Sequence, residues 1–199
     1  MLRHKGTQWL GTERLRLCPL SPNYADEMYK GWSGDNEVTK YLSWPTHDSP
    51  EVTRKILMDW SENYTSTKYY NWGIFLKENG KLIGTISFIN INDYKSSAEI
   101  GYVISKKYWN QGYASEAARR ILEFGFNDIG FKSVVGYHHP RNTNSGKVME
   151  KIGMKREGWL PGTMMNNKGQ KCDVIKYTAL RANFIESTVK EIDNNETGN

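Results

Sequence analysis

Hydrophobic and polar positions in the middle of the chain follow the short period of β-strands. Residues 72–76, 82–91 and 98–105 are apolar or alternating runs separated by polar turns, the first of which contains Asn79-Gly80. An Asn-Gly pair between two such runs is typical of a β-hairpin, so this region predicts an antiparallel meander. Residues 14–17 alternate in the same way and predict a half-buried first strand, which Pro19 and Pro22 end.

Other segments show helical spacing. Asn23 is predicted to cap a short helix that reaches Met28 and Tyr29. Ser49-Pro50 predicts a second helix start, because proline suits the first helical position. The apolar stripe of this second helix is Val52, Ile56 and Trp60. A long amphipathic helix is predicted over residues 112–127, with an apolar face formed by Ala114, Ala117, Ala118, Ile121, Leu122 and Gly125.

The remaining elements are a strand at 132–137, a helix at 142–152, and strands near Lys155 and at 174–180. Helices, then a meander, then alternating strands and helices predict an α+β protein with a mixed sheet. The chain contains no internal repeat or long linker, so we expect one domain over residues 1–184. Residues 185–199 hold four acidic residues and one lysine, which predicts an acidic, solvated tail.

Composition narrows the class of protein further. The chain has 199 residues, 38% of them hydrophobic, which is enough for a real core. It contains no apolar run near the roughly 18 residues of a membrane span and no apolar signal segment, so we expect a cytoplasmic protein that does not bind membranes. Two cysteines, Cys18 and Cys172, are too few for a disulfide scaffold or a cysteine-based metal site.

The segment from Ala98 to Ala118 carries the most chemical information. A predicted strand leads through a short loop containing Gly112 directly into a helix. The first turn of a helix presents unpaired backbone N–H groups and the positive end of the helix dipole. Because Gly112 and Ala114 are small, a phosphate group has room to approach this backbone. A plain tight turn before a helix explains the pattern equally well at this point.

Four motifs together resemble the GNAT superfamily of acetyl-CoA-dependent N-acetyltransferases, over roughly residues 11–183. They are Gly-Thr-Glu-Arg-Leu-Arg-Leu17, Ala98-Glu-Ile-Gly-Tyr-Val-Ile, Tyr108-Trp-Asn-Gln-Gly-Tyr-Ala-Ser-Glu-Ala, and Asn142-Thr-Asn-Ser-Gly-Lys-Val-Met-Glu-Lys-Ile-Gly-Met. The branch that acetylates the N-termini of ribosomal proteins is the most similar. The resemblance implies a mixed, mostly antiparallel sheet flanked by helices, with a splayed pair of strands that holds acetyl-CoA.

The resemblance also implies where the co-substrate binds. The pantetheine arm is expected along the main chain of Val103 and Ile104, where the N–H of Val103 would polarise the thioester. Where the family's pyrophosphate loop begins with Gln or Arg, this chain has Trp109, which leaves phosphate binding to backbone N–H groups. The expected cofactor-binding residues are Val103, Ile104, Trp109, Asn110, Gln111, Gly112, Tyr113, Ala114, Ser115, Asn142 and Lys147.

Acetyl transfer to an amine also needs a proton acceptor and a proton donor. Glu99 matches a position where relatives carry a catalytic glutamate, and it is predicted to be the general base, directly or through a water. Many relatives place a proton-donating tyrosine where this chain has Met149, so Ser145 is the predicted substitute acid. By strand alternation, Tyr102 is expected on the opposite face from Glu99, where it serves mainly for packing.

Histidines and aromatic residues add weaker predictions. His138 and His139 are adjacent on a predicted strand and point to opposite faces, so no metal site is expected. Tyr41 and Trp44 precede Pro45 in a loop that walls the acceptor pocket in this fold, and they are candidate substrate contacts. Asn142 could contact the cofactor or simply cap the helix that follows it.

The most favoured acceptor is a protein N-terminal α-amine. With ordinary pKa values, roughly 14% of α-amines but only about 0.04% of lysine amines are neutral at pH 7. The alternatives are a polyamine or aminoglycoside, with Glu51, Asp59 and Glu62 as an acidic pocket, or an acyl-CoA-binding module without activity. Whether the protein is a monomer or a homodimer is left open.

The net charge of +5 fits this interpretation. Residues 101–160 hold ten Lys and Arg against five Asp and Glu, and the remaining 139 residues sum to zero. The positive charge therefore lies in the segment predicted to bind coenzyme A, whose phosphates carry about three to four negative charges. It includes Lys106, Lys107, Arg119, Arg141 and Lys147. No nucleic-acid-binding motif is recognisable, so a nucleic-acid partner is not expected.

Overall fold

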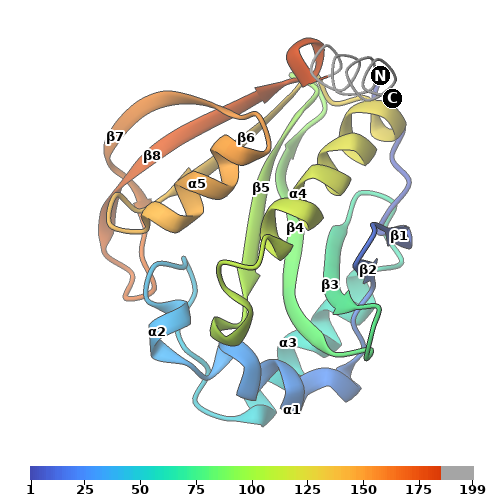
Figure 1. Cartoon of the computed structure of the whole chain (residues 1–199), viewed down its shortest axis with the longest axis vertical. Coiled ribbons are helices and arrows are strands. Elements are labelled where there is room, and N and C mark those ends of the chain that lie inside the picture. Colours follow the sequence, from blue (N-terminus) through green and yellow to red (C-terminus); the bar gives the residue numbers. More distant parts are fainter. Residues whose placement is uncertain (185–199) are drawn as a thin grey trace, which may run out of the picture.

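A computed structural model describes residues 1–184, which are built around one eight-stranded sheet (Figure 1). The predicted tail, residues 185–199, lies outside the described residues. The strands are β1 (Leu10–Gly11), β2 (Leu15–Cys18), β3 (Tyr70–Leu76), β4 (Leu82–Asn92), β5 (Ser97–Ile104), β6 (Ser133–His138), β7 (Lys155–Met165) and β8 (Lys171–Leu180). Their order in the sheet is β1-β2-β3-β4-β5-β6-β8-β7, and only β5 and β6 among them are parallel neighbours. The predicted mixed, mostly antiparallel sheet is confirmed.

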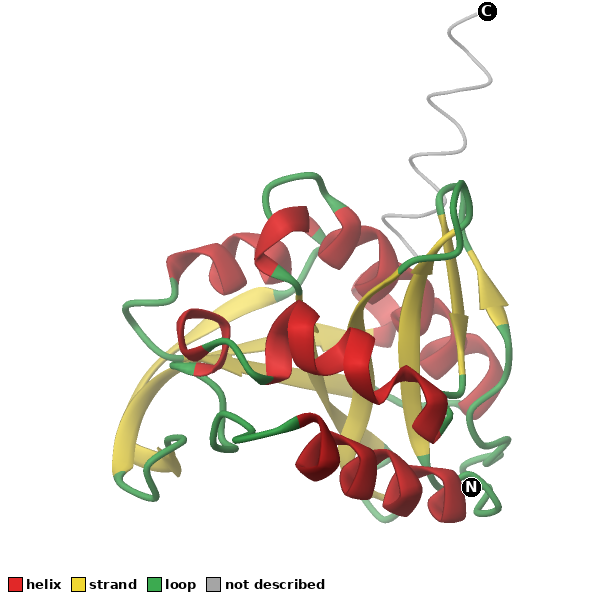
Figure 2. Ribbon diagram, turned by 90° about the horizontal axis from the view of Figure 1, so that it is seen from below, coloured by secondary structure: helices red, strands yellow, loops and turns green. Residues whose placement is uncertain are grey.

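Helices lie on both faces of the sheet (Figure 2). The α-helices are α1 (Ala25–Met28), α2 (Asn36–Thr39), α3 (Pro50–Asn63), α4 (Tyr113–Phe124) and α5 (Thr143–Lys151). Shorter 3₁₀ or π turns are η1 (Pro22–Tyr24), η2 (Tyr29–Ser33), η3 (Lys106–Tyr108) and η4 (Gly125–Ile129). No helix within residues 1–184 has the length and apolar character that crossing a bilayer would require.

Two apolar clusters follow the alternation of the strands. Ile74, Ile86 and Ile100 face the cluster covered by α4, which adds Ile121 and Leu122. The other cluster combines Phe75 and Val103 with Met28 of α1 and Leu57 of α3. Because successive strand residues point to opposite faces, a single sheet supplies both cores.

One of the two predicted helix starts is confirmed, and the other is wrong. Ser49 caps α3 as predicted, because its side chain accepts the N–H of Glu51 at 3.2 Å and Pro50 occupies the first turn. Asn23 does not cap α1; it lies within η1, whose N-cap is Ser21, and the α-helix begins at Ala25. The 3₁₀ turn that begins at Pro22 therefore precedes the α-helix, whose N-cap is Tyr24 in place of Asn23.

The predicted apolar stripe of α3 is only partly confirmed as a core-facing surface. The buried side chains of α3 are Thr53 and Leu57, whereas Val52 is exposed. Ile56 is exposed and lines a cavity, whereas Trp60 lines the same cavity and also packs against the second apolar cluster. Apolar residues at helical spacing indicate which face of a helix is apolar. They do not show whether that face packs in the core or lines a binding cavity.

Candidate active site

The parallel strands β5 and β6 separate after a short ladder. Their register pairs Ser97 with Ser133 and Glu99 with Val135, and extends no further. β6 continues to His138 against β8 instead. Residues 100–104 of β5 therefore face a gap, which opens where β5 and β6 diverge in Figure 1. The predicted splayed pair of strands is confirmed.

The backbone of β5 alternates between the gap and β4. The N–H of Ser105 donates to the carbonyl of Ile83 at 2.8 Å, and the register with β4 is continuous from Ile104 to Glu99. In an antiparallel ladder, bonded residues alternate, so the N–H of Val103 also points toward β4. The backbone groups of Tyr102 and Ile104 point into the gap. This alternation favours Tyr102 and Ile104, rather than Val103, as the source of N–H groups for a ligand.

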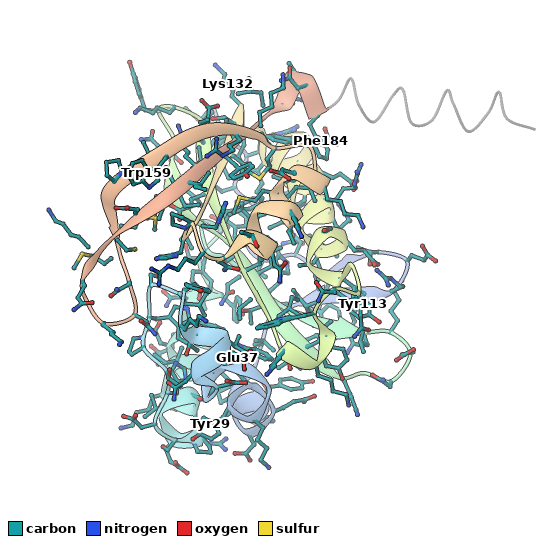
Figure 3. The ribbon with its side chains drawn as sticks, turned by 60° about the vertical axis from the view of Figure 1, so that its left-hand side comes forward. Tyr29, Glu37, Tyr113, Lys132, Trp159 and Phe184 are labelled. Carbon is teal, nitrogen blue, oxygen red and sulfur yellow. The ribbon has the colours of Figure 1, made fainter. Side chains whose placement is uncertain are left out.

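Gly112 begins α4 in a conformation that suits glycine. Its φ is 82°, in the left-handed region, and it is the N-cap residue. A Cβ placed there would lie 3.4 Å from Nη2 of Arg14 and 3.9 Å from Nζ of Lys151. The unpaired N–H groups at the start of this 12-residue helix thus lie beside two cationic side chains. Tyr113 marks this end of α4 in Figure 3.

Arg14 is held in place by several contacts. Its Nε donates to Oε2 of Glu116 at 2.7 Å, and its Nη1 donates to the carbonyl of Gln111 at 3.1 Å. The guanidinium also lies 4.4 Å from the centroid of the Tyr113 ring. Glu116 additionally accepts the backbone N–H of Arg14 at 2.9 Å and the hydroxyl of Thr12 at 2.5 Å. An acidic residue in the first turn of α4 therefore fixes a cation at the same helix end.

A groove with mostly cationic charged residues runs from the gap to the N-terminal end of α4, and we call it the basic groove. Its volume is about 490 Å³. The charged residues on its walls are Glu37, Lys40, Arg141, Lys147 and Lys151. All but one of the expected cofactor-binding residues line it, and Gln111 lies in the adjoining hollow with Arg14 and Arg119.

Not every cation named from the sequence faces this groove. Lys106 forms an ion pair with Glu37, with 2.6 Å between Nζ and Oε2. Lys107 lies 5.9 Å from the centroid of the Tyr108 ring and does not line the groove. Arg14 and Lys151, which the sequence analysis did not select, lie closer to the helix start than either. The local charge excess was a correct signal, but only the folded chain identifies its members.

Trp109, at the departure from the family's loop pattern, turns inward. Its Nε1 donates to the carbonyl of Ile104 at 2.7 Å, and its ring packs against both apolar clusters. The side chain therefore fixes the end of β5 relative to the loop. It also occupies a backbone acceptor of Ile104 that would otherwise face the gap.

A second cavity of about 470 Å³ lies at the other end of the gap, and we call it the aromatic cavity. Tyr41 and Trp44, the candidate substrate contacts, line this cavity. Tyr41 stacks on His139 with ring centroids 5.0 Å apart. Its other wall residues with a phenol or indole ring are Trp60, Tyr69, Tyr102 and Tyr137.

The basic groove and the aromatic cavity share six lining residues, which mark their junction: Tyr41, Leu42, Tyr102, Val103, Asn142 and Ser145. The hydroxyl of Tyr102 donates to the carbonyl of Ser145 at 2.8 Å and lies 3.0 Å from its Oγ. Tyr102 thus does more than pack, contrary to the expectation. Burial raises the pKa of Tyr102 above its ordinary value, so the phenol stays protonated.

Asn142 and Met149 complete the α5 side of the junction. Asn142 occupies the N-cap position of α5, yet its side chain makes no capping hydrogen bond. The capping alternative is therefore wrong for this side chain. Met149 is buried against Gly136, where a Cβ would lie 3.1 Å from its sulfur. It fills space at the position where relatives carry a proton donor.

Glu99 lines the aromatic cavity and is half-buried. Its Oε2 accepts a hydrogen bond from Nδ2 of Asn90 at 2.9 Å. Burial raises the pKa of Glu99 above its ordinary value, and the Asn90 bond only partly opposes this. Burial, and after it the negative charge of Glu99, raises the pKa of Tyr137, which lines the same cavity.

The adjacent histidines lie in different surroundings. His138 is buried, and its Nδ1 lies 2.9 Å from the carbonyl of His139, while His139 stacks on Tyr41. Burial lowers the pKa of His138. Within residues 1–184, no group of three or more His, Cys, Asp or Glu side chains is arranged to hold a metal ion.

This fold and site define an acyltransferase that binds a phosphorylated acyl carrier: a splayed strand pair leads to a glycine-initiated helix with cations around it. Residues 14–155 match the acetyltransferase (GNAT) domain, and the chain belongs to this family. It is an N-acetyltransferase. Acetyltransferases of this fold use acetyl-CoA, and the basic groove has the charge and the unpaired strand edge that this co-substrate needs.

Several relatives support the assignment. The uncharacterised N-acetyltransferase p20 of Bacillus licheniformis is 29% identical over 175 residues, which cover 88% of this chain and 97% of that protein. YdaF of Bacillus subtilis, a proposed ribosomal N-acetyltransferase, is 29% identical over 126 residues, or 63% of this chain and 67% of that one. The crystal structure of a GNAT-family acetyltransferase from Bacillus anthracis has a TM-score of 0.76 at 29% identity, covering 88% and 99% of the two chains.

Proposed function

We propose that this enzyme transfers an acetyl group from acetyl-CoA directly to a primary amine, and that the amine is the α-amine of a protein N-terminus. The observation that carries the proposal is the junction between the basic groove and the aromatic cavity. There, two hydroxyls and a free strand edge lie between a site for phosphates and a cavity containing one carboxylate.

The residues of the junction divide the reaction among them. The N–H groups of β5 that point into the gap stabilise negative charge on the thioester oxygen. The C–N bond forms as the C–S bond breaks, and the amine loses one proton while the sulfur gains one. Glu99 accepts the first proton. Ser145 donates the second to the departing sulfur, and Tyr102 orients its hydroxyl.

Glu99 acts through a water molecule in this proposal. It lies three residues from Tyr102 along β5, which corresponds to about 10 Å at the usual rise per residue. One bridging water extends the reach of a carboxylate by one hydrogen bond. The raised pKa of Glu99 makes it a stronger base than an exposed glutamate, which suits proton removal from an amine.

Two features favour an α-amine over a polycation. A much larger fraction of α-amines than of lysine-type amines is neutral at pH 7, so the weaker acid–base machinery around Met149 is sufficient. The acidic pocket considered for polyamines does not form: Glu51, Asp59 and Glu62 are exposed on α3 and do not line the cavity. The name of YdaF points to the same class of acceptor.

The test compares Glu99→Gln with Glu157→Gln, an exposed glutamate on β7. Thiol release from acetyl-CoA is followed with N-terminal peptides, and acetyl-CoA affinity is measured separately. We expect Glu99→Gln to reduce kcat by roughly 10²- to 10⁴-fold with nearly unchanged affinity, and Glu157→Gln to change neither. An unchanged kcat would remove Glu99 from the mechanism. Binding of acetyl-CoA without thiol release for any amine would identify a binding module instead.

A further inference from the structure

The aromatic cavity contains very little charge for a site that receives an amine. Glu99 is its one acidic lining residue, and none of its lining residues is a lysine or arginine. His47, His138 and His139 also line it, and burial lowers the pKa of His47 and His138, which favours their neutral forms. A substrate with two or more ammonium groups would bury at least one of these charges away from water. The cavity wall offers no second carboxylate to compensate for that loss of solvation.

Flat and polarisable groups make up the wall instead. Tyr41 and His139 form a stacked pair with an interplanar angle of 23°, and Trp44 lies 5.3 Å from His47 between ring centroids. Trp60 and Ile56 of α3 extend the same surface. Aromatic and aliphatic groups of a ligand gain most from such surroundings, because both their burial and their ring contacts are favourable.

The β7–β8 hairpin closes the opposite side with soft side chains. Met164, Met165, Cys172 and Val174 of this hairpin line the cavity. Nδ2 of Asn167, at the hairpin tip, donates to the carbonyl of Thr39 at 3.3 Å, which connects the hairpin to α2. Thioether side chains adapt to apolar partners of different shape, which fits a wall around an apolar group.

We infer that the acceptor is a primary amine attached to an aromatic or bulky apolar group, with no second cationic group close to it. This inference rests on the proposed acetyl transfer and specifies its substrate class. Two sources share this chemistry: a peptide whose first residue is aromatic or large and apolar, and a small arylalkylamine. Glu99 accepts the proton of the amine, and the apolar group occupies the space between Trp60 and the hairpin.

The experiment measures thiol release from acetyl-CoA with matched acceptors. Peptides of one sequence begin with Phe, Leu, Ala or Lys, and phenethylamine and spermidine represent small amines. We expect kcat/KM for the Phe peptide to exceed that for the Ala peptide at least tenfold, and spermidine to react more slowly than phenethylamine. Comparison of the Phe peptide with phenethylamine distinguishes the two sources.

A charge variant tests the wall itself. Met165→Glu places a carboxylate at the cavity, whereas Met58→Glu introduces the same change at an exposed methionine of α3 that does not line it. We expect Met165→Glu to lower the ratio of phenethylamine to spermidine rates at least threefold and Met58→Glu to leave it unchanged. An equal or faster reaction of the Ala or Lys peptide with the unmodified enzyme overturns the inference alone. An equal or faster reaction of spermidine overturns both the inference and the α-amine acceptor, while acetyl transfer to an amine stands. No thiol release with any acceptor overturns the proposed function and this inference together.

Discussion

Replacement of Gly112 by alanine tests how the enzyme holds the phosphates of acetyl-CoA. The added methyl group has two separate effects. It forces an L side chain into the left-handed region at φ 82°, and it lies 3.4 Å from Nη2 of Arg14 at the helix start. The first effect concerns stability, and the second concerns the space in which a phosphate would meet the N–H groups of α4.

The two effects have different expected sizes. A non-glycine residue in the left-handed region costs about 1–2 kcal/mol, which lowers the Tm of a chain of this size by roughly 2–8 °C. Loss of one charge-assisted hydrogen bond to phosphate costs about 1.5–3 kcal/mol. That loss corresponds to a roughly 10- to 150-fold weaker affinity for acetyl-CoA.

Gly80→Ala is the matched control. Gly80 has φ 71°, and a Cβ there would meet no atom within 4 Å; it lies in the β3–β4 turn, which does not line the basic groove, the adjoining hollow or the aromatic cavity. Thermal unfolding and the KM for acetyl-CoA are measured for both variants. We expect similar losses of Tm but a raised KM only for Gly112→Ala. If both variants raise KM equally, the helix start does not hold the phosphates and the reasoning is wrong.

Three further predictions follow from the packing and the charges of the site. On its acidic side, the pH profile of kcat/KM contains two ionisations, that of the acceptor amine and that of Glu99. The Glu99 ionisation lies above the ordinary glutamate range because burial raises its pKa, and Glu99→Gln removes this ionisation while that of the amine remains. Burial alone would raise the pKa of Glu116, but bonds from Thr12 and Arg14 lower it overall. Glu116→Gln therefore costs about 1 kcal/mol near neutral pH. In thermal melts this difference shrinks as the pH falls through the lowered pKa, because wild type then loses the same contribution. Gly84→Ala costs roughly 3 kcal/mol in denaturant unfolding, since its Cβ would overlap the backbone carbonyl of Val103, and an unchanged midpoint would contradict that approach.

Much of the fold is readable from local patterns. Alternation and the Asn79-Gly80 turn correctly predict β3 and β4, and Ser49-Pro50 correctly predicts the start of α3. These signals are local because a turn residue or a cap acts on its own backbone. The resemblance of four motifs adds the splayed strands, which no periodicity could reveal.

The site shows where local patterns stop being informative. Arg14 is 98 residues from Gly112 along the chain, yet it lies beside that glycine because β2 and α4 pack together. The hydroxyl of Tyr102 meets Ser145 for a similar reason: β5 and β6 separate, and α5 follows β6 to the far side of the gap. Neither contact has a signature in sequence spacing.

The amino-acid sequence alone determined the order and class of the main strands and helices, though not the short β1 and α2, together with the helix start at Gly112 and the surplus of positive charge between residues 101 and 160. Only the tertiary structure decided which cations surround that helix start, and that Ile56 and Trp60 line a cavity. Secondary structure depends on the conformations of neighbouring residues. A binding cavity depends instead on surfaces brought together from distant segments, and apolar periodicity is the same whether such a surface meets protein or ligand.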